Sequence, residues 1–386
     1  MAPWPERFVA RHAAEIRALL LLGATLSVIL QAKNQALGMG VETTELARSL
    51  ASGRGFMLVG VPSAHSAPLF PAILAGLLKL FGDGPAFSFS VMALEIVLQW
   101  TIILLLPVVS KRLLKSAWIG YCAAAVLIPA NVIWMGWEAS AGAVWLEVAA
   151  IATATPLVSG SLMGLGALLS PMVGLAVFVM HFRWNRGFAL SLIVAALLCS
   201  PWTIRNYAIF HRFIPIRDSS GLAVRVSYNP FAVVSVHGST VAFYQYEPIV
   251  NPEMKQKLIA MGEADFYDWL GEGAKEWVRN NPKRSLELLV GRVVAYWFPP
   301  DQPILILLTL FSLAALRLAW REASLRRLVF ALLVVFPLPY YLVLSSTRYR
   351  MPTLWFTALL MGMLISNALE FSVRRSGAVA TDATLQ

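Results

Sequence analysis

The sequence predicts an all-α polytopic membrane protein with about ten transmembrane helices. Mean hydropathy is +0.67, and 58% of the residues are hydrophobic. Only 13% are charged, whereas soluble domains carry roughly 25%. Long apolar runs alternate with short basic clusters, as in proteins that cross a bilayer repeatedly. We expect a first outer loop that lies against the membrane and a mostly helical cap on the same side.

The apolar runs define the expected spans, each judged against the roughly 20 residues that cross a bilayer. Residues 156–182 are apolar but broken by Pro156, Pro171 and several glycines, so we interpret them as a hairpin of two short helices. The other expected spans are 18–33, 86–110, 118–134, 139–155, 187–201, 304–318, 328–344 and 353–369.

The positive-inside rule orients these spans. Basic clusters at the N-terminus and at 111–115, 183–186, 317–327 and 374–375 all fall on the cytoplasmic side if two conditions hold. The apolar segment 69–80 must not cross, and the hairpin 156–182 must cross an even number of times. Both termini are then cytoplasmic. The loops 36–85, 135–140, 203–300 and 345–352 share the outer face.

This topology divides the chain into three parts. Residues 1–202 form an N-terminal transmembrane module with the first outer loop (36–85). Residues 203–300 form the cap, and 301–386 form a C-terminal transmembrane module. The cap is rich in Tyr, Phe, Trp and Val, which argues against disorder. Its expected helices are 264–279 and those begun by the Asn-Pro pairs at 251–252 and 281–282, the last running through 285–298; 213–246 is expected to be irregular.

Two helices are predicted inside the first outer loop. The first has Thr43 or Thr44 as candidate cap and ends at Gly53, because glycine tolerates a positive φ. Pro68 and Pro71 can open the second, 69–80. That helix is too short to span, so we expect it to lie along the membrane or dip into it.

Arginines at the outer ends of spans are candidates for binding a phosphate leaving group, because guanidinium is always charged and binds oxyanions in a bidentate manner. An ordinary alternative is contact with lipid headgroups. The pair in Arg348-Tyr349-Arg350 is notable, since it lies against the positive-inside bias. The candidates for binding a donor phosphate are Arg205, Arg292, Arg348 and Arg350.

Acids on the outer face are candidates for a catalytic base. Glu42 lies near the start of the first loop helix, where a solvated acid would also be favoured by the helix dipole, and Glu45 is its rival. Glu138 opens the span after the second outer loop. We assign His65, Lys79 and Tyr349 to substrate binding, although an isolated histidine such as His65 or His237 is usually polar surface.

Other chemistries have no sequence signal. We find no HExxH, CxxC, P-loop or GxSxG pattern, and Cys122 and Cys199 both lie in apolar runs, so neither a disulfide framework nor a metal site is predicted. No cofactor is expected to be required, and metal dependence is left open. The net charge of +10 reflects topology rather than nucleic-acid binding.

Taken together, the outer segments resemble the GT-C superfamily of integral-membrane glycosyltransferases, specifically its bacterial protein-mannosyltransferase-like and aminoarabinose-transferase-like group. The resemblance covers most of the chain and depends on the order of several short motifs. These are ARSLASGRGF at 47–56, AHSAPLFP at 64–71, PWTIRNYAIFHRFIPIR at 201–217, YNP at 228–230, WVRNNPKR at 277–284 and RYRMP at 348–352.

The resemblance implies inverting transfer of a sugar from a polyprenyl-phosphate carrier to a lipid, glycan or protein acceptor at the periplasmic face of a bacterial inner membrane. The family's catalytic acid, usually Asp, falls on Met39 here, and the nearest acid in register is Glu42. Glu138 matches a second family acid. Arg205, Arg348 and Arg350 match positions near the lipid phosphate, so the implied partners are the donor, an acceptor and membrane lipids.

Two other classes of protein remain open. A non-catalytic relative would keep the fold and bind a lipid carrier during envelope assembly, and Met39 favours it. A transporter or flippase is the second, but the outer polar region is large and no internal repeat is evident, as many transporters show. Lipid binding without turnover would separate the non-catalytic relative from the enzyme.

Overall fold

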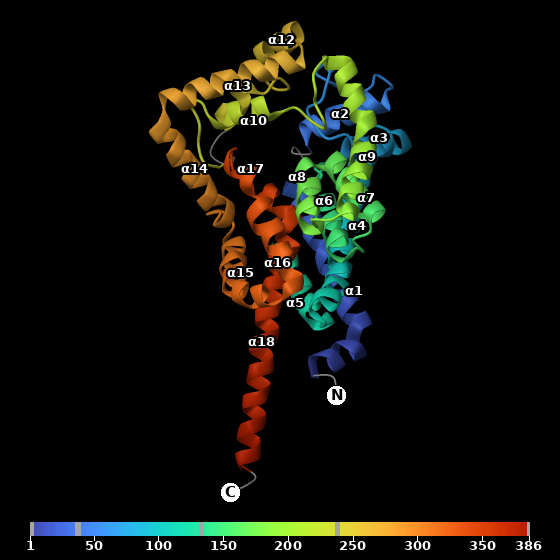
Figure 1. Cartoon of the computed structure of the whole chain (residues 1–386), viewed down its shortest axis with the longest axis vertical. Helices are drawn as coiled ribbons and strands as arrows, with labels where there is room; N and C mark the ends of the chain where they lie inside the picture. Colours follow the sequence, from blue (N-terminus) through green and yellow to red (C-terminus); the bar gives the residue numbers. More distant parts are fainter. Residues whose placement is uncertain (1–3, 35–39, 131–134, 236–239, 384–386) are drawn as a thin grey trace.

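The computed structural model describes residues 4–34, 40–130, 135–235 and 240–383 of the chain. Most of this is helical, and the sheet formed by the described residues is one hairpin of β1 (Met57–Leu58) and β2 (Val61–Pro62). The bundle lies below a layer made by α10, α12 and α13, and both termini lie at the opposite end of the molecule (Figure 1). The predicted class, a helical membrane protein, is confirmed.

In the described part, six helical segments are long and apolar enough to cross a membrane. They coincide with six of the expected spans. They are α1 (Trp4–Asn34), α4 (Pro85–Leu114), α9 (Arg186–Phe210), α15 (Pro303–Arg321), the run from α16 (Ala323–Val329) through a π-helix (Phe330–Val335) to α17 (Leu338–Tyr341), and α18 (Met351–Ala383).

Five further apolar helices are shorter than a full span. Two of them, α5 and α6, lie in the expected spans 118–134 and 139–155, two form the expected hairpin 156–182, and the fifth, α3, is the segment predicted not to cross. They are α3 (Leu69–Phe81), α5 (Ala117–Ala130), α6 (Ala139–Ile151), α7 (Pro156–Leu169) and α8 (Pro171–His181). The predicted break in 156–182 is therefore confirmed at Ser170-Pro171, while the total of ten spans stays a prediction.

One helix end differs from its prediction. We expected the span 187–201 to stop at Pro201, but α9 continues through this proline to Phe210. Proline is tolerated inside membrane helices because neighbouring groups satisfy the freed carbonyl. As a result, Arg205 lies on a rigid helix rather than in the polar loop.

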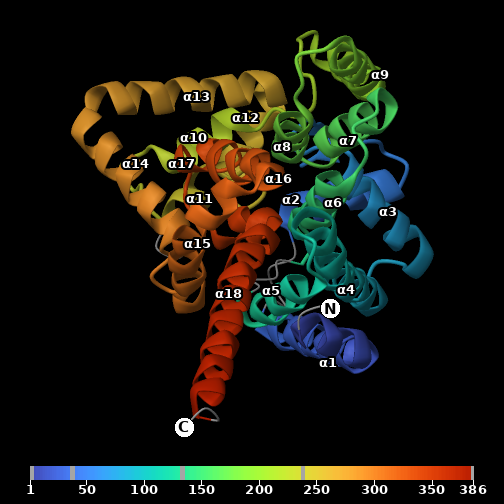
Figure 2. The same cartoon turned by 60° about the horizontal axis from the view of Figure 1, so that its bottom comes forward.

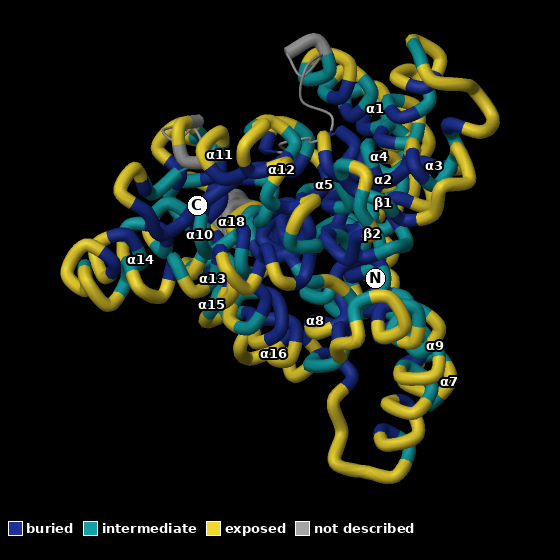
Figure 3. The backbone as a smooth tube through the Cα atoms, turned by 90° about the horizontal axis from the view of Figure 1, so that it is seen from above, coloured by how far each residue is buried: buried dark blue, intermediate teal, exposed yellow. Residues whose placement is uncertain are grey.

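Small residues set the close packing of the bundle. A Cβ on Gly160 would lie 2.5 Å from the Ser191 carbonyl oxygen, so α7 and α9 approach nearer than larger side chains permit. α18 packs beside α5 and α15 and then extends past the bundle (Figures 1 and 2). Buried backbone gathers in the middle of the molecule, and outer turns of α9, α14 and α16 are exposed (Figure 3).

The cap is mostly helical, as predicted, and the helix starts at both Asn-Pro pairs are confirmed. Asn251 accepts hydrogen bonds from the backbone N–H groups of Glu253 and Met254, which is a typical N-cap. The region expected to be irregular contains two short helices. The cap helices are α10 (Ser220–Ser227), α11 (Thr240–Tyr246), α12 (Pro252–Met261), α13 (Glu263–Asn280) and α14 (Pro282–Trp297).

The long cap helix α13 presents its apolar side to the cap interior. Phe266 and Leu270 are buried against Leu258, whereas Trp269 remains 38% exposed. Lys257 Nζ lies 3.7 Å from the centre of a Trp269 ring, a cation–π contact that covers the exposed indole. The side of α13 that faces the cap interior therefore includes Phe266 and Leu270, whereas Trp269 lies partly at the surface.

Backbone contacts tie the cap to the first outer loop, in which α2 (Val41–Ala51) precedes the β-hairpin. Glu263 Oε1, at the start of α13, accepts a 2.5 Å hydrogen bond from Ala64 N. Asp218 N donates to Ala64 O at 2.8 Å. Both contacts join segments far apart in sequence, so the loop and the cap form one layer above the bundle.

The Glu263 contact predicts a pH dependence of stability. Burial, opposed in part by hydrogen bonds from Ser63 and Ala64, raises the pKa of Glu263 from 4.5 to about 8. The folded state thus keeps a proton that the unfolded chain releases near pH 4.5. The contribution of Glu263 to the free energy of unfolding is fully present below that pH. It is lost as the pH rises through 8, by at most about 1.4 kcal/mol per pH unit.

We therefore expect Glu263→Gln to flatten the fall in melting temperature of the detergent-solubilised protein between pH 5 and pH 8, because glutamine retains the accepting oxygen without the titration. Glu276→Gln, at an exposed position on the same helix, is the control and should leave the wild-type slope. Equal slopes in all three proteins would contradict the role given to Glu263.

Candidate functional site

A cavity opens between the bundle and the cap, at the end where the predicted outer loops meet. Its first chamber has a volume of about 390 Å³. Its walls come from α2, the segment before α3, the α7–α8 turn, and both sides of the link that precedes α18. The lining includes Glu42, His65, Trp137, Glu138, Ser170, Arg217, Tyr340, Arg348 and Tyr349.

A second chamber, of about 350 Å³, adjoins the first on the cap side. Glu42, Arg348 and Tyr349 line both chambers. The first chamber extends toward the bundle through the α7–α8 turn and Pro352, whereas the second extends into the cap through α10 and α11. Glu42 and Arg348 therefore lie at the junction between the first chamber, on the bundle side, and the second chamber, on the cap side.

Glu42 is positioned by a close approach between two outer loops. Gly40 precedes α2, and its backbone N–H donates to Met135 O at 3.4 Å. A Cβ at Gly40 would lie 2.6 Å from the Gly136 carbonyl oxygen, so glycine is needed there. Glu42 follows in the first helical turn, 8% exposed, and lines both chambers. Its rival Glu45 lines neither chamber.

Arg348 is held flat against an aromatic platform. Its guanidinium carbon lies 3.7 Å from the centre of a Trp137 ring, and its Nη2 donates to the Tyr349 hydroxyl at 3.4 Å. Tyr349 stacks on Tyr340 with ring centres 4.4 Å apart. Stacking fixes the plane of the guanidinium and leaves its edge for an oxyanion.

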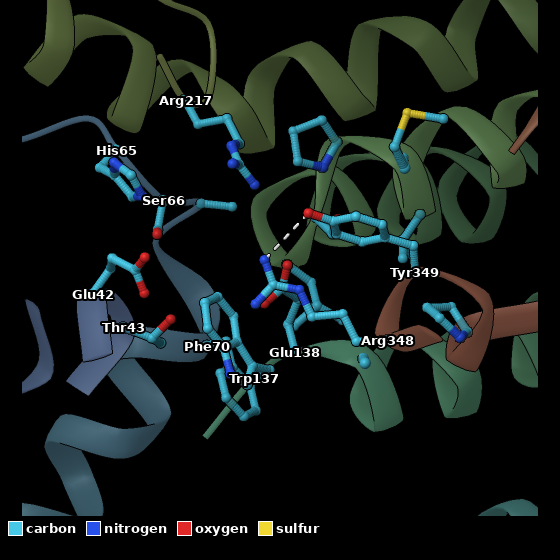
Figure 4. A pocket seen from close by; sticks show the side chains of 18 of the residues that line it. Glu42, Thr43, His65, Ser66, Phe70, Trp137, Glu138, Arg217, Arg348 and Tyr349 are labelled. Atoms are coloured by element: carbon cyan, nitrogen blue, oxygen red, sulfur yellow. Dashed lines mark hydrogen bonds between the residues drawn. The ribbon is translucent and has the colours of Figure 1, made fainter. Parts of the chain in front are cut away.

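Glu138 is the residue that caps the start of α6, but its side chain makes no capping hydrogen bond. It instead lines the first chamber beside Arg348 (Figure 4). In the same view Glu42, Thr43, His65 and Ser66 lie together on the other side of the space. Two acids, Glu42 and Glu138, and two arginines, Arg217 and Arg348, thus face one cavity from four separate stretches of chain.

His65 is a neutral polar group at this site. Burial and the charges of Arg217 and Arg348 lower the pKa of its imidazole to about 3. Its Nδ1 lies 2.7 Å from the Tyr267 hydroxyl of α13. His65 therefore joins the loop to the cap and presents an uncharged ring to both chambers.

Several residues at this site were not predicted from the sequence, among them Trp137, Arg217, Tyr340 and Glu247. Glu247 follows α11, is 2% exposed and lines the second chamber. Burial and the nearby Glu42 carboxylate raise the pKa of Glu247 to about 8. Trp137 could have been found from its position directly before the predicted Glu138. No feature of the sequence around Glu247 indicates that it belongs to the site.

Three predicted arginines contact the protein's own backbone instead of the cavity. Arg205 donates to Ser63 O and Phe56 O, at 2.6 and 3.1 Å. Arg292, fully buried on α14, donates to Ser227 O at 2.5 Å. Arg350 donates to Trp297 O at 3.1 Å and to the Thr309 hydroxyl at 3.0 Å. None of them lines either chamber.

The structure brings together five of the predicted site residues and separates four. Glu42, His65, Glu138, Arg348 and Tyr349 line the first chamber. Arg205, Arg292 and Arg350 have the contacts just given, and Lys79 is exposed on α3 away from both chambers. Met39 and His237 lie outside the described residues.

Among the described residues, no group of three or more His, Cys, Asp and Glu side chains is arranged to hold a metal ion. No protein-family model matches this chain, and neither a curated protein nor a solved structure is detectably similar to it. The chemistry of the site must therefore be argued from the cavity itself.

Proposed function

We propose that this protein transfers a sugar from a polyprenyl-phosphate-linked donor to an envelope acceptor, in a GT-C-like reaction with inversion. The observation that carries the proposal is the placement of Glu42 and Arg348 in one cavity between bundle and cap. An acid and a fixed guanidinium that face one space are what this transfer needs. The resemblance of the outer motifs to GT-C glycosyltransferases agrees with it.

The donor phosphate is assigned to Arg348. Leaving-group charge grows on the phosphate as the bond from its oxygen to the anomeric carbon breaks, and a preorganised cation stabilises that charge. Stacking on Trp137 means that Arg348 loses little further freedom on binding. The polyprenyl chain leaves the chamber past the α7–α8 turn, where the lining includes Leu169, Met172 and Val173.

The base is assigned to Glu42. It removes the proton from an acceptor hydroxyl as the oxygen attacks the anomeric carbon from the face opposite the phosphate, through an oxocarbenium-like transition state. The phosphate departs as the polyprenyl phosphate anion, and the configuration inverts. Glu138, beside Arg348, is assigned to orienting the acceptor, and His65 and Tyr349 are assigned polar contacts to substrate.

The proposed setting is the periplasmic face of a bacterial inner membrane. The basic clusters favour a cytoplasmic location for the end of the bundle that carries both termini. The cavity then opens on the outer side, where nucleotide sugars are absent and lipid-linked sugars are the donors. The alternative is a relative that binds the lipid without transferring a sugar, and lipid binding without turnover would identify it.

Photo-crosslinking tests the proposed donor site. A polyprenyl phosphate with a diazirine next to its phosphate should label peptides that contain 169–173 or 339–343, since both line the first chamber. Excess unlabelled polyprenyl phosphate should abolish this labelling. Labelling confined to the lipid-facing sides of α1 and α9, and unaffected by the competitor, would remove the assignment.

A further inference from the structure

A third cavity, of about 360 Å³, lies at the other end of the bundle, where the predicted cytoplasmic clusters meet. The end of α4 contributes Leu113, the end of α6 contributes alanines from 149 to 154, and α8 contributes Met180 and His181. Arg183 follows α8, and α16 contributes Ser324 and Arg327. None of these residues belongs to the site described above.

Two cations of this cavity have no counter-charge of their own. In the described ranges of the chain, neither Arg183 nor Arg327 forms a salt bridge or a side-chain hydrogen bond, and no acid lines the cavity. Both guanidiniums lie within electrostatic range of the His181 imidazole. An anion placed between them would meet two free, always charged groups.

His181 does not add a third cation. A carbonyl oxygen can only accept, so the 2.9 Å contact of Nε2 with Ala149 O places the proton on Nε2. Nδ1 then accepts from the Ser159 hydroxyl at 2.8 Å. The imidazole is fully satisfied as a neutral ring and joins α6, α7 and α8, so it serves as a rigid wall of the cavity.

The helix ends around this cavity do not neutralise it. α4, α6 and α8 all end here, and a helix C-terminus carries about half a negative charge. Some of those carbonyls already have partners, such as Ala149 O with His181 and Val148 O with Ala152 N. These fractional negative charges favour arginines at this end. Their sum is smaller than the two positive charges of Arg183 and Arg327, so the cavity stays positive.

Exposed tryptophans place this end at the level of lipid headgroups. Trp184, next to Arg183, is 93% exposed, and Trp320, at the end of α15, is 57% exposed. Tryptophan gathers at the membrane–water boundary, where its ring meets both apolar and polar surroundings. The cavity combines cations with apolar walls from Leu113, Met180 and Leu328, which matches a phosphate that carries hydrocarbon chains.

We propose that this cavity binds the phosphate headgroup of an anionic phospholipid between Arg183 and Arg327. Topology alone does not require the arrangement, because Arg186 and Arg321 satisfy the positive-inside bias without lining this cavity. Basic pockets between transmembrane helices are known to suit anionic headgroups. This site is separate from the proposed reaction and does not depend on it.

The test is native mass spectrometry of the purified protein with phosphatidylglycerol and phosphatidylcholine. The wild type should prefer phosphatidylglycerol by roughly tenfold or more, the scale of a lost charge-assisted contact. Arg183→Gln/Arg327→Gln should lose most of this preference. The matched double variant Arg186→Gln/Arg321→Gln changes the net charge equally and should keep it.

Three results would overturn the proposal. An equal loss of preference in both double variants would assign it to net charge rather than to the cavity. Displacement of the lipid by inorganic phosphate at equal concentration would identify a site for a free anion instead. Retained preference in Arg183→Gln/Arg327→Gln, with an unchanged melting temperature, would also remove the assignment.

Discussion

Replacing Glu42 by glutamine is expected to lower the turnover rate by about 10²-fold or more, because general-base catalysis contributes at least that factor. Glutamine keeps the size of the side chain but cannot accept the acceptor's proton. Binding of polyprenyl phosphate should be nearly unchanged, since the phosphate is assigned to Arg348. The measurement is the initial rate of polyprenyl phosphate release, together with a separate binding titration.

Glu45→Gln is the matched control for this experiment. Both acids lie on α2, but only Glu42 lines the chambers. Glu45→Gln should therefore keep the rate within a few-fold of the wild type. A wild-type rate for Glu42→Gln would rule it out as the base, and equal losses in both variants would point to a general effect on α2.

We expect Arg348→Gln to weaken the binding of polyprenyl phosphate by about tenfold or more, the effect of removing one charge-assisted contact. Lysine at this position would keep the charge but lose the flat stacking on Trp137, so Arg348→Lys should fall between glutamine and the wild type. Isothermal titration in detergent or nanodiscs measures these affinities.

Two other arginines separate binding from folding in the same series. Arg321 is the last residue of α15, at the end of the bundle away from the chambers. Arg321→Gln should therefore retain the wild-type affinity. Arg350→Ala removes donors to Trp297 O and Thr309 and should lower the melting temperature more than it lowers affinity. Unchanged affinity for Arg348→Gln in a folded protein would move the donor phosphate elsewhere.

The sequence predicted which loops meet, because that depends on span order and on the positions of basic residues. The first chamber draws together Glu42, Glu138 and Arg348 from three predicted outer loops. The third cavity likewise draws together Leu113, Arg183 and Arg327 from three predicted inner ends. Hydropathy and charge are properties of whole segments. The loops that share one side of the membrane can therefore be predicted without knowing where individual side chains point.

The roles of the individual arginines could not be predicted in this way. Arg205, Arg292, Arg348 and Arg350 all look alike next to span ends, yet only Arg348 lines the chamber. The other three satisfy backbone carbonyls that long-range packing brings to them. Whether a guanidinium meets a carbonyl or an open cavity depends on contacts between distant segments, which no local pattern encodes.

Some helix ends could be predicted from the local sequence, whereas others depend on the surroundings of the helix. The end of α2 near Gly53 and the start of α12 after Asn251 follow from residues with specific backbone preferences. The continuation of α9 through Pro201 depends on its membrane surroundings. Glu247 enters the site through the fold of the cap, where Glu42 and burial together raise its pKa.

The most direct measurement follows both products of the proposed reaction in proteoliposomes. A polyprenyl phosphate carrying a radiolabelled sugar is supplied with an extract of envelope acceptors. The account predicts that wild-type protein releases polyprenyl phosphate and labels an acceptor in equal amounts, and that Glu42→Gln does neither at a comparable rate. Tight binding of the lipid donors by the wild type, without transfer from any of them, would contradict the account and identify a lipid-carrier-binding protein.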